Sequence, residues 1–147
     1  MTAVRGVRGA TTAAANERGA ILAATRELLD QIVQRNRMAP ADVASVWFTA
    51  TPDLDAEFPA FAAREIGWAD VPLICGREIP VPGALERCVR VLIHWNTDRS
   101  QPEVRHVFLR GARALRPQWA VDLPGDRPLA PSAELDGGSK GYEKEAT

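Results

Sequence analysis

Three charged residues lie in segments that otherwise have the apolar composition of buried β-strands. Arg8 lies in the first such segment, Glu78 at the end of the third, and Arg90 in the middle of the fourth. Buried charges need partners, because removing an unpaired charge from water is costly. A structural ion pair between Arg90 and Glu78 would meet this need, and Arg8 and Glu78 also fit a simpler interpretation as solvated residues. Alternatively, the arginines bind an anion, since the guanidinium group is always charged and can bind a carboxylate with two donors.

The cysteines and histidines show no catalytic or metal-binding spacing. Cys75 and Cys88 do not form a Cys-x-x-Cys pair, and His94 and His106 are twelve residues apart. The sequence also lacks a nucleophile elbow, a glycine-rich phosphate loop and a zincin motif. We therefore expect no metal and no cofactor, and we interpret Cys75 as a small core thiol and both histidines as packing or surface residues.

Composition indicates a globular protein of ordinary type. The chain has 147 residues, a net charge of −1, 46% hydrophobic residues and 25% charged residues, close to the average for soluble domains. No apolar run is long enough to span a membrane, and the N-terminus lacks a signal-peptide pattern, so we expect a cytoplasmic protein. Residues 1–119 hold fifteen arginines against thirteen acidic residues, an excess too small to suggest a nucleic-acid partner.

The last part of the chain differs from the rest in composition. From residue 120 onward the sequence is rich in proline, glycine and charge, and it holds six acidic residues against three basic ones. No apolar period is visible there, which is typical of a flexible tail. We therefore divide the chain into a domain of residues 1–119 and an acidic tail of residues 120–147.

Hydrophobic periodicity predicts the elements that position the charged residues. Period-two alternation and apolar runs predict strands, and three-to-four spacing predicts helices. The expected strands span residues 4–11, 45–51, 71–78, 87–96 and 105–109, and the expected helices span about 17–36 and 56–66, with a last helical turn ending at 117. This order indicates an α/β or α+β domain.

Several local features refine these elements. Asn16 is a suitable N-cap for the first helix and Gly67 a suitable C-cap for the second, whose apolar side begins with Phe58. The strand at 45–51 is apolar enough to be buried on both faces. Because two helices can cover only one face of a sheet, we expect a homo-oligomer whose sheets face inward.

Five sequence blocks, in this order, resemble the AroH-class chorismate mutases. They are Arg-Gly-Val-Arg-Gly-Ala-Thr-Thr (5–12), Ala-Thr-Pro-Asp-Leu-Asp-Ala-Glu-Phe-Pro-Ala (50–60), Val-Pro-Leu-Ile-Cys-Gly-Arg-Glu-Ile-Pro-Val-Pro-Gly (71–83), Arg-Cys-Val-Arg-Val (87–91) and Arg-His-Val-Phe-Leu (105–109). The resemblance covers about residues 4–117. It implies an α+β fold with a mixed five-stranded sheet and two main helices on one face, assembled as a homotrimeric pseudo-α/β-barrel with active sites between neighbouring subunits.

The resemblance also implies a reaction, the isomerisation of chorismate to prephenate in the phenylalanine and tyrosine branch of aromatic amino acid biosynthesis. This pericyclic rearrangement needs no nucleophile, metal or proton transfer, which agrees with the missing catalytic motifs. Arg90 matches the arginine that donates to the ether oxygen and a carboxylate, Arg8 the one that binds a carboxylate, and Glu78 the group that accepts from the ring hydroxyl. The other residues implied at the substrate are Phe58, Arg64, Leu73, Ile74, Cys75, Phe108, Leu115 and Arg116.

Two positions depart from the family pattern, and two other functions stay open. Phe108 stands where the family usually has tyrosine, so a donor to a substrate carboxylate is lost, and Phe61 stands where a charged residue is common near the entrance. One alternative function is a non-catalytic trimer that binds a small carboxylate metabolite at the same interface. The other is a purely structural oligomer, in which Arg8, Glu78 and Arg90 would pair with one another.

Overall fold

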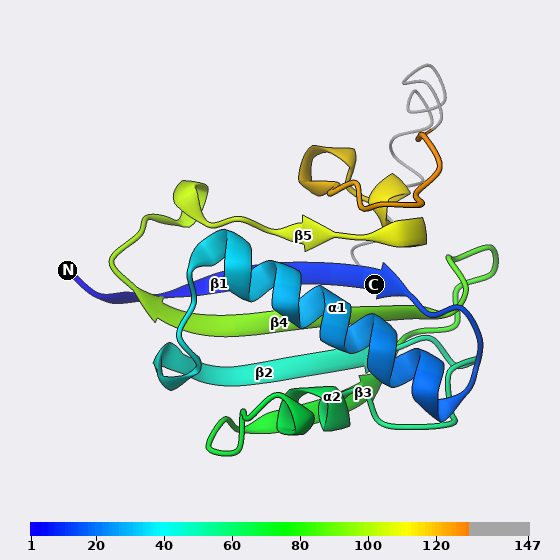
Figure 1. The fold of residues 1–147 in the computed structure, drawn as a ribbon, viewed down its shortest axis with the longest axis horizontal. Coiled ribbons are helices and arrows are strands. Elements are labelled where there is room, and N and C mark those ends of the chain that lie inside the picture. Colours follow the sequence, from blue (N-terminus) through cyan, green and yellow to red (C-terminus); the bar gives the residue numbers. More distant parts are fainter. Residues whose placement is uncertain (130–147) are drawn as a thin grey trace.

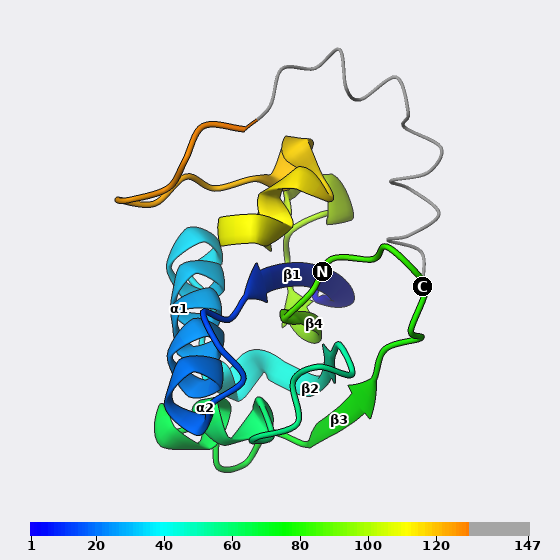
Figure 2. The ribbon, with the colours of Figure 1, turned by 90° about the vertical axis from the view of Figure 1, so that its right-hand side faces the viewer.

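A five-stranded mixed sheet carries both α-helices on one of its faces (Figures 1 and 2). The computed structural model describes residues 1–129. Its strands are β1 (Ala3–Thr12), β2 (Val43–Ala50), β3 (Leu73–Arg77), β4 (Cys88–Thr97) and β5 (Val107–Phe108), its α-helices are α1 (Arg18–Asn36) and α2 (Ala60–Glu65), and its 3-10 helices are η1 (Pro40–Asp42), η2 (Gln101–Glu103), η3 (Arg110–Ala114) and η4 (Pro117–Trp119). The predicted α+β architecture with five strands and two main helices is therefore confirmed.

The longest strands form the centre of the sheet, whose strand order is β3-β2-β4-β1-β5. Strand β4 runs antiparallel to both β1 and β2, whereas β3 is parallel to β2 and β5 is parallel to β1. One face of the sheet packs against α1 and forms the main core. Its buried residues include Val7, Leu28, Leu29, Ile32, Val46, Phe48, Val91 and Ile93.

The close approach of α1 to the sheet depends on Gly9 in β1. A Cβ atom at this position would lie 2.7 Å from Ile32 Cδ1 and 2.9 Å from Val91 Cγ1, closer than carbon atoms pack in a folded core. We expect Gly9→Ala to lower the free energy of unfolding by about 1–3 kcal/mol, the usual cost of overpacking. Urea unfolding measures this change. Gly19→Ala on α1 is the matched control, since no atom lies within 4 Å of its added Cβ, and an equal loss in both variants would contradict the packing argument.

The second face of the sheet is only partly covered in residues 1–129. The segment that joins β3 to β4 runs along this side (Figure 2), where Leu85 packs against the cluster of Ala10 and Phe108. Elsewhere on this face Trp47 and Ile74 are each 50% exposed. The prediction that the strand at 45–51 is buried on both faces is therefore wrong for the single chain, because the helices cover one face only.

The loop before α2 explains two further corrections. Asn16 does not cap α1, whose N-cap residue is Glu17; instead the Asn16 Oδ1 atom accepts hydrogen bonds from the backbone N–H groups of Asp55 and Ala56. These bonds hold the segment that was expected to start the second helix in a non-helical conformation. The helix begins only after Pro59, whose fixed φ suits a helix start.

The N-terminal end of α2 therefore differs from the prediction, but its C-terminal end does not. Phe58 precedes the helix and is 63% exposed, so it is not part of an apolar helix side. Gly67 has a φ of 93° and follows the C-cap residue Ile66, which places it where the sequence predicted the end of the helix.

The first residues of the expected tail contact the domain. The Val121 N–H group donates to the Phe108 carbonyl at 2.9 Å, and Arg113 forms an ion pair with Asp122 at 2.7 Å. Asp126 in turn pairs with Arg110 at 3.0 Å. Residues 130–147, the rest of the expected tail, lie outside the described residues. Within residues 1–129, no helix is both long and apolar enough to cross a membrane.

Candidate active site

The partly covered sheet face brings the predicted charged residues together. In the strand register, Arg90 on β4 lies between Ala10 on β1 and Thr49 on β2, and Arg8 lies opposite Leu92. Arg8 and Arg90 are thus diagonal neighbours on one face, a relation that places Cα atoms about 7–8 Å apart. Two arginines that are diagonal neighbours on one sheet face can bind a small dianion together.

Glu78 follows β3 directly and binds Arg90. The Arg90 Nε and Glu78 Oε1 atoms are 2.9 Å apart, and both side chains are less than one-tenth exposed. The Thr49 hydroxyl donates to the same Oε1 atom at 2.8 Å, while the Glu78 backbone N–H donates to the Ala50 carbonyl and extends the pairing of β3 with β2. The ion pair considered from the sequence is present, and it lies on the sheet face that the helices do not cover.

Thr49 is a residue of the candidate site that sequence reasoning missed. Its position two residues after Trp47 places it on the same face of β2, so the period-two pattern of the strand was a usable signal. The hydroxyl holds the Glu78 carboxylate oxygen that also pairs with Arg90. A carboxylate held by both a guanidinium and a hydroxyl has little freedom to rotate.

Arg8 borders a group of aromatic side chains at the other end of the site. Its guanidinium carbon lies 5.8 Å from the centre of the Phe108 ring, and Trp119 lies 5.6 Å from the same ring. The Arg116 guanidinium lies over Trp119 at 3.9 Å, and Leu115 packs against the same cluster. The structure therefore brings together the predicted residues Arg8, Phe108, Leu115 and Arg116, and it adds Trp119.

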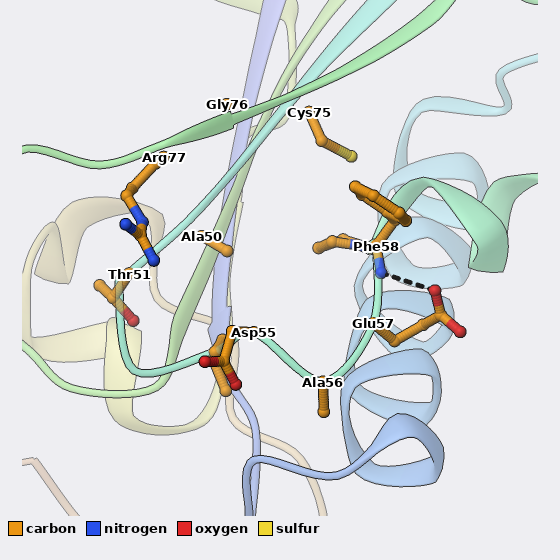
Figure 3. A pocket seen from close by; sticks show the side chains of 11 residues that line it. Ala50, Thr51, Asp55, Ala56, Glu57, Phe58, Cys75, Gly76 and Arg77 are labelled. Carbon is orange, nitrogen blue, oxygen red and sulfur yellow. Dashed lines mark hydrogen bonds between the residues drawn. The ribbon is translucent and has the colours of Figure 1, made fainter.

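The remaining predicted residues, apart from Ile74, lie on the opposite face of β3. Leu73 and Cys75 pack against the main core, and Cys75 points toward Phe58 (Figure 3). Arg64 lies on α2 with its guanidinium 5.4 Å from the centre of the Phe61 ring. Cys75 and Phe58 line a cavity of about 360 Å³ together with Ala50, Thr51, Asp55 and Arg77. We refer to Phe58, Arg64, Leu73 and Cys75 as the helix-side group, and to Arg8, Glu78 and Arg90 as the sheet-face group.

Neither thiol is suited to nucleophilic chemistry. Burial raises the pKa of Cys75, and it raises the pKa of the fully buried Cys88 to about 11, although Arg90 nearby opposes the shift. Both thiols are protonated at neutral pH, whereas a thiol nucleophile acts as the thiolate. Among residues 1–129, no three His, Cys, Asp or Glu side chains gather as they would around a metal ion.

Comparison with known proteins decides the family. The profile described as "Chorismate mutase type I" matches residues 4–119. The chain belongs to this family. The resemblance found in the five sequence blocks is confirmed, and so is the predicted enzyme class, a chorismate mutase acting as an intramolecular isomerase.

Two relatives and one solved structure show how far the similarity of this family member extends. The chorismate mutase AroH of Thermus thermophilus is 52% identical over 115 residues, which cover 78% of this chain and 94% of that protein. The chorismate mutase AroH of Bacillus subtilis (strain 168) is 44% identical over 119 residues, covering 80% and 94%. A solved chorismate mutase from Clostridium thermocellum has a TM-score of 0.73 at 46% identity, covering 74% of this chain and 97% of that one.

Proposed function

We propose that this chorismate mutase family member converts chorismate to prephenate, in the biosynthesis of phenylalanine and tyrosine, at a site built on Arg90, Glu78 and Arg8. The observation that supports these residues is the position of the Glu78–Arg90 pair, because an ion pair as such is expected for the structural oligomer too. The pair lies on a sheet face that the helices leave partly open, and it is less than one-tenth exposed. A charged pair in this position can contact a ligand without a prior rearrangement of its side chains. The cytoplasmic location and the domain boundary at residue 119 stay predictions.

The geometry suits a reaction without chemical intermediates. As the ether C–O bond of chorismate breaks and the new C–C bond forms, negative charge grows on the ether oxygen. A guanidinium aimed at this oxygen stabilises the transition state more than the substrate, and this difference lowers the barrier. Because Glu78, itself bound by the Thr49 hydroxyl, pairs with Arg90 beforehand, little reorganisation is needed during the reaction.

Arg8 supplies the second contribution, which is restraint of the substrate. Chorismate is a flexible dianion that must adopt a folded diaxial shape before it reacts. A carboxylate bound by Arg8 on β1 and an ether oxygen bound by Arg90 on β4 would hold the two reacting parts together. Restraint of this kind removes part of the entropic barrier.

We also propose that the protein is a homotrimer with a pseudo-α/β-barrel at its centre. The helix-side group and the sheet-face group occupy opposite faces of β3, so a small molecule bound to one chain does not reach both. Val4, Trp47 and Ile74, all at least half exposed, form apolar surface on the sheet face, and a neighbouring subunit would bury it. If one subunit contributes the sheet-face group and the next the helix-side group, a closed ring of three has three complete sites.

The test is to mix the purified protein with chorismate and to follow the loss of chorismate absorbance in the ultraviolet. We expect fast loss with prephenate as the product. No loss, combined with a chorismate-dependent rise in melting temperature, would favour the non-catalytic binder instead. Neither turnover nor a thermal shift would favour the structural oligomer.

Phe108 offers a separate test of how this member binds its substrate. The ring is fully buried beside Arg8, and it lacks the hydroxyl that the family usually places there. We expect Phe108→Tyr to lower KM by about three- to tenfold with kcat nearly unchanged, because one added hydrogen bond to a carboxylate contributes about 0.5–1.5 kcal/mol. Steady-state kinetics measure this change. A raised KM would show instead that the hydroxyl overfills the pocket.

A further inference from the structure

His106 lies behind Arg8, outside the residues that the resemblance assigns to the substrate. Its Nδ1 atom accepts a hydrogen bond from the Arg8 backbone N–H at 2.9 Å. Its ring contacts the Trp119 ring in a tilted arrangement, with a centroid separation of 4.1 Å and an angle of 42° between the planes. The side chain is therefore fixed on two sides, by the strand that carries Arg8 and by the helical turn after Arg116.

The hydrogen bond completes the edge of β1. Strand β5 pairs with β1 only from Gly9 onward, through the partners Gly9 with Val107 and Ala10 with Phe108. Arg8 lies one residue before this ladder, and the ring nitrogen of His106 accepts its N–H in place of a backbone carbonyl. Without this acceptor the N–H would have to find water or shift, because an unsatisfied backbone group in a partly buried position is costly.

We propose that neutral His106 is a positioning residue, which fixes the Arg8 backbone so that the guanidinium is held ready for a substrate carboxylate. The inference rests on the function proposed above for Arg8. An acceptor at Nδ1 requires the proton to be on Nε2, so only the neutral ring, in one tautomer, can make this bond.

The surroundings of His106 favour the neutral ring. Arg8 from β1 and Arg116 before η4 both act on it, and Arg35 at the end of α1 and Arg105 line the same surface pocket. Burial first, and the Arg8 and Arg116 charges second, lower the pKa of His106. At a pH below this pKa, the ring is protonated at Nδ1, the bond to Arg8 is lost, and a further positive charge is added among the arginines.

Two substitutions of His106 distinguish the contribution of its hydrogen-bond acceptor from that of its ring. His106→Asn keeps an acceptor, since Asn Oδ1 occupies the same position relative to Cγ as Nδ1, and it removes the ring that contacts Trp119. His106→Phe keeps a ring against Trp119 and removes the acceptor. We expect His106→Phe to raise KM for chorismate by about tenfold with kcat changed less than about threefold, and His106→Asn to restore most of the affinity. The reverse order would show that the ring contact with Trp119, not the hydrogen bond, is the role of His106.

The dependence of kcat/KM on pH provides a second test, because a purely structural role of His106 would not change it. In the wild type, kcat/KM should fall on the acid side as His106 is protonated, with a midpoint below 6.5, the usual pKa of histidine. In His106→Asn this acid limb should be absent. Superimposable profiles in wild type and His106→Asn would overturn the proposal, even where His106→Phe fails to fold.

Failure of this inference is distinguishable from failure of the proposed function. If the wild type does not convert chorismate, the proposed activity is wrong. If it does, but Arg8→Ala leaves KM unchanged, the role of Arg8 is wrong. If both hold and the His106 variants match the wild type in KM and in pH profile, only the positioning role of His106 is wrong.

Discussion

Replacing Arg90 with alanine lowers kcat for chorismate by at least about 100-fold, which corresponds to about 3 kcal/mol or more of activation free energy. The expected size follows from the position of Arg90. Its guanidinium is fixed by Glu78 at 2.9 Å in a nearly buried site, where a donor aimed at developing negative charge acts in a low local dielectric. Arg90→Lys keeps the positive charge but loses the planar fork, so we expect it to recover only part of the activity. An absorbance assay of chorismate consumption measures kcat for both variants.

A loss of structure must be separated from a loss of catalysis in this experiment. Arg90→Ala leaves the Glu78 carboxylate buried without its guanidinium, so we expect a lower melting temperature as well. Arg26→Ala is the matched control. Arg26 forms an ion pair of 2.6 Å with Glu65 between α1 and α2, but these side chains are 45% and 40% exposed. Exposed pairs contribute little, so Arg26→Ala should keep nearly full activity. Turnover at the wild-type rate in folded Arg90→Ala would refute the assignment of Arg90.

Much of the fold was predictable because its periodic patterns are strong. The alternation around Arg90 on β4 and the three-to-four spacing along α1 decide element types without any tertiary information. The start of α2 was not predictable in this way. It depends on Asn16, which binds the backbone at Asp55 and Ala56, and a contact across 39 residues leaves no local signal in the sequence.

The sequence draws attention to the charged residues of the candidate site, but not to the residues that support them. Charges inside apolar segments are unusual, which draws attention to Arg8, Glu78 and Arg90, but it is the family resemblance that assigns these three to a substrate. Thr49 and His106 are ordinary residue types, and their contacts appear only when the fold places Thr49 beside Glu78 and His106, the residue before β5, beside Arg8. These supporting contacts depend on which strands are neighbours in the sheet, and a single sequence does not show the strand order directly.

The helix-side and sheet-face groups make complementation between subunits the decisive test of the assembly. Arg90→Ala removes the central residue of the sheet-face group, and Phe58→Asp places a negative charge in the helix-side group, where it would repel a dianionic substrate. Phe58 is 63% exposed in the chain, so its substitution should not impair folding. Each variant alone should have little activity, because every site in its homotrimer carries the same defect.

Unfolding the two variants together and refolding them as a mixture should restore activity. If each site takes its sheet-face group from one subunit and its helix-side group from the next, random assembly of equal amounts gives intact sites in about one quarter of cases. We therefore expect the refolded mixture to reach about one quarter of the wild-type kcat per subunit, measured with saturating chorismate. The control is the same pair mixed without unfolding, which should regain activity only as fast as subunits exchange. A refolded mixture no more active than the sum of its parts would mean that each site is built within a single chain, and the proposed interface sites would be wrong.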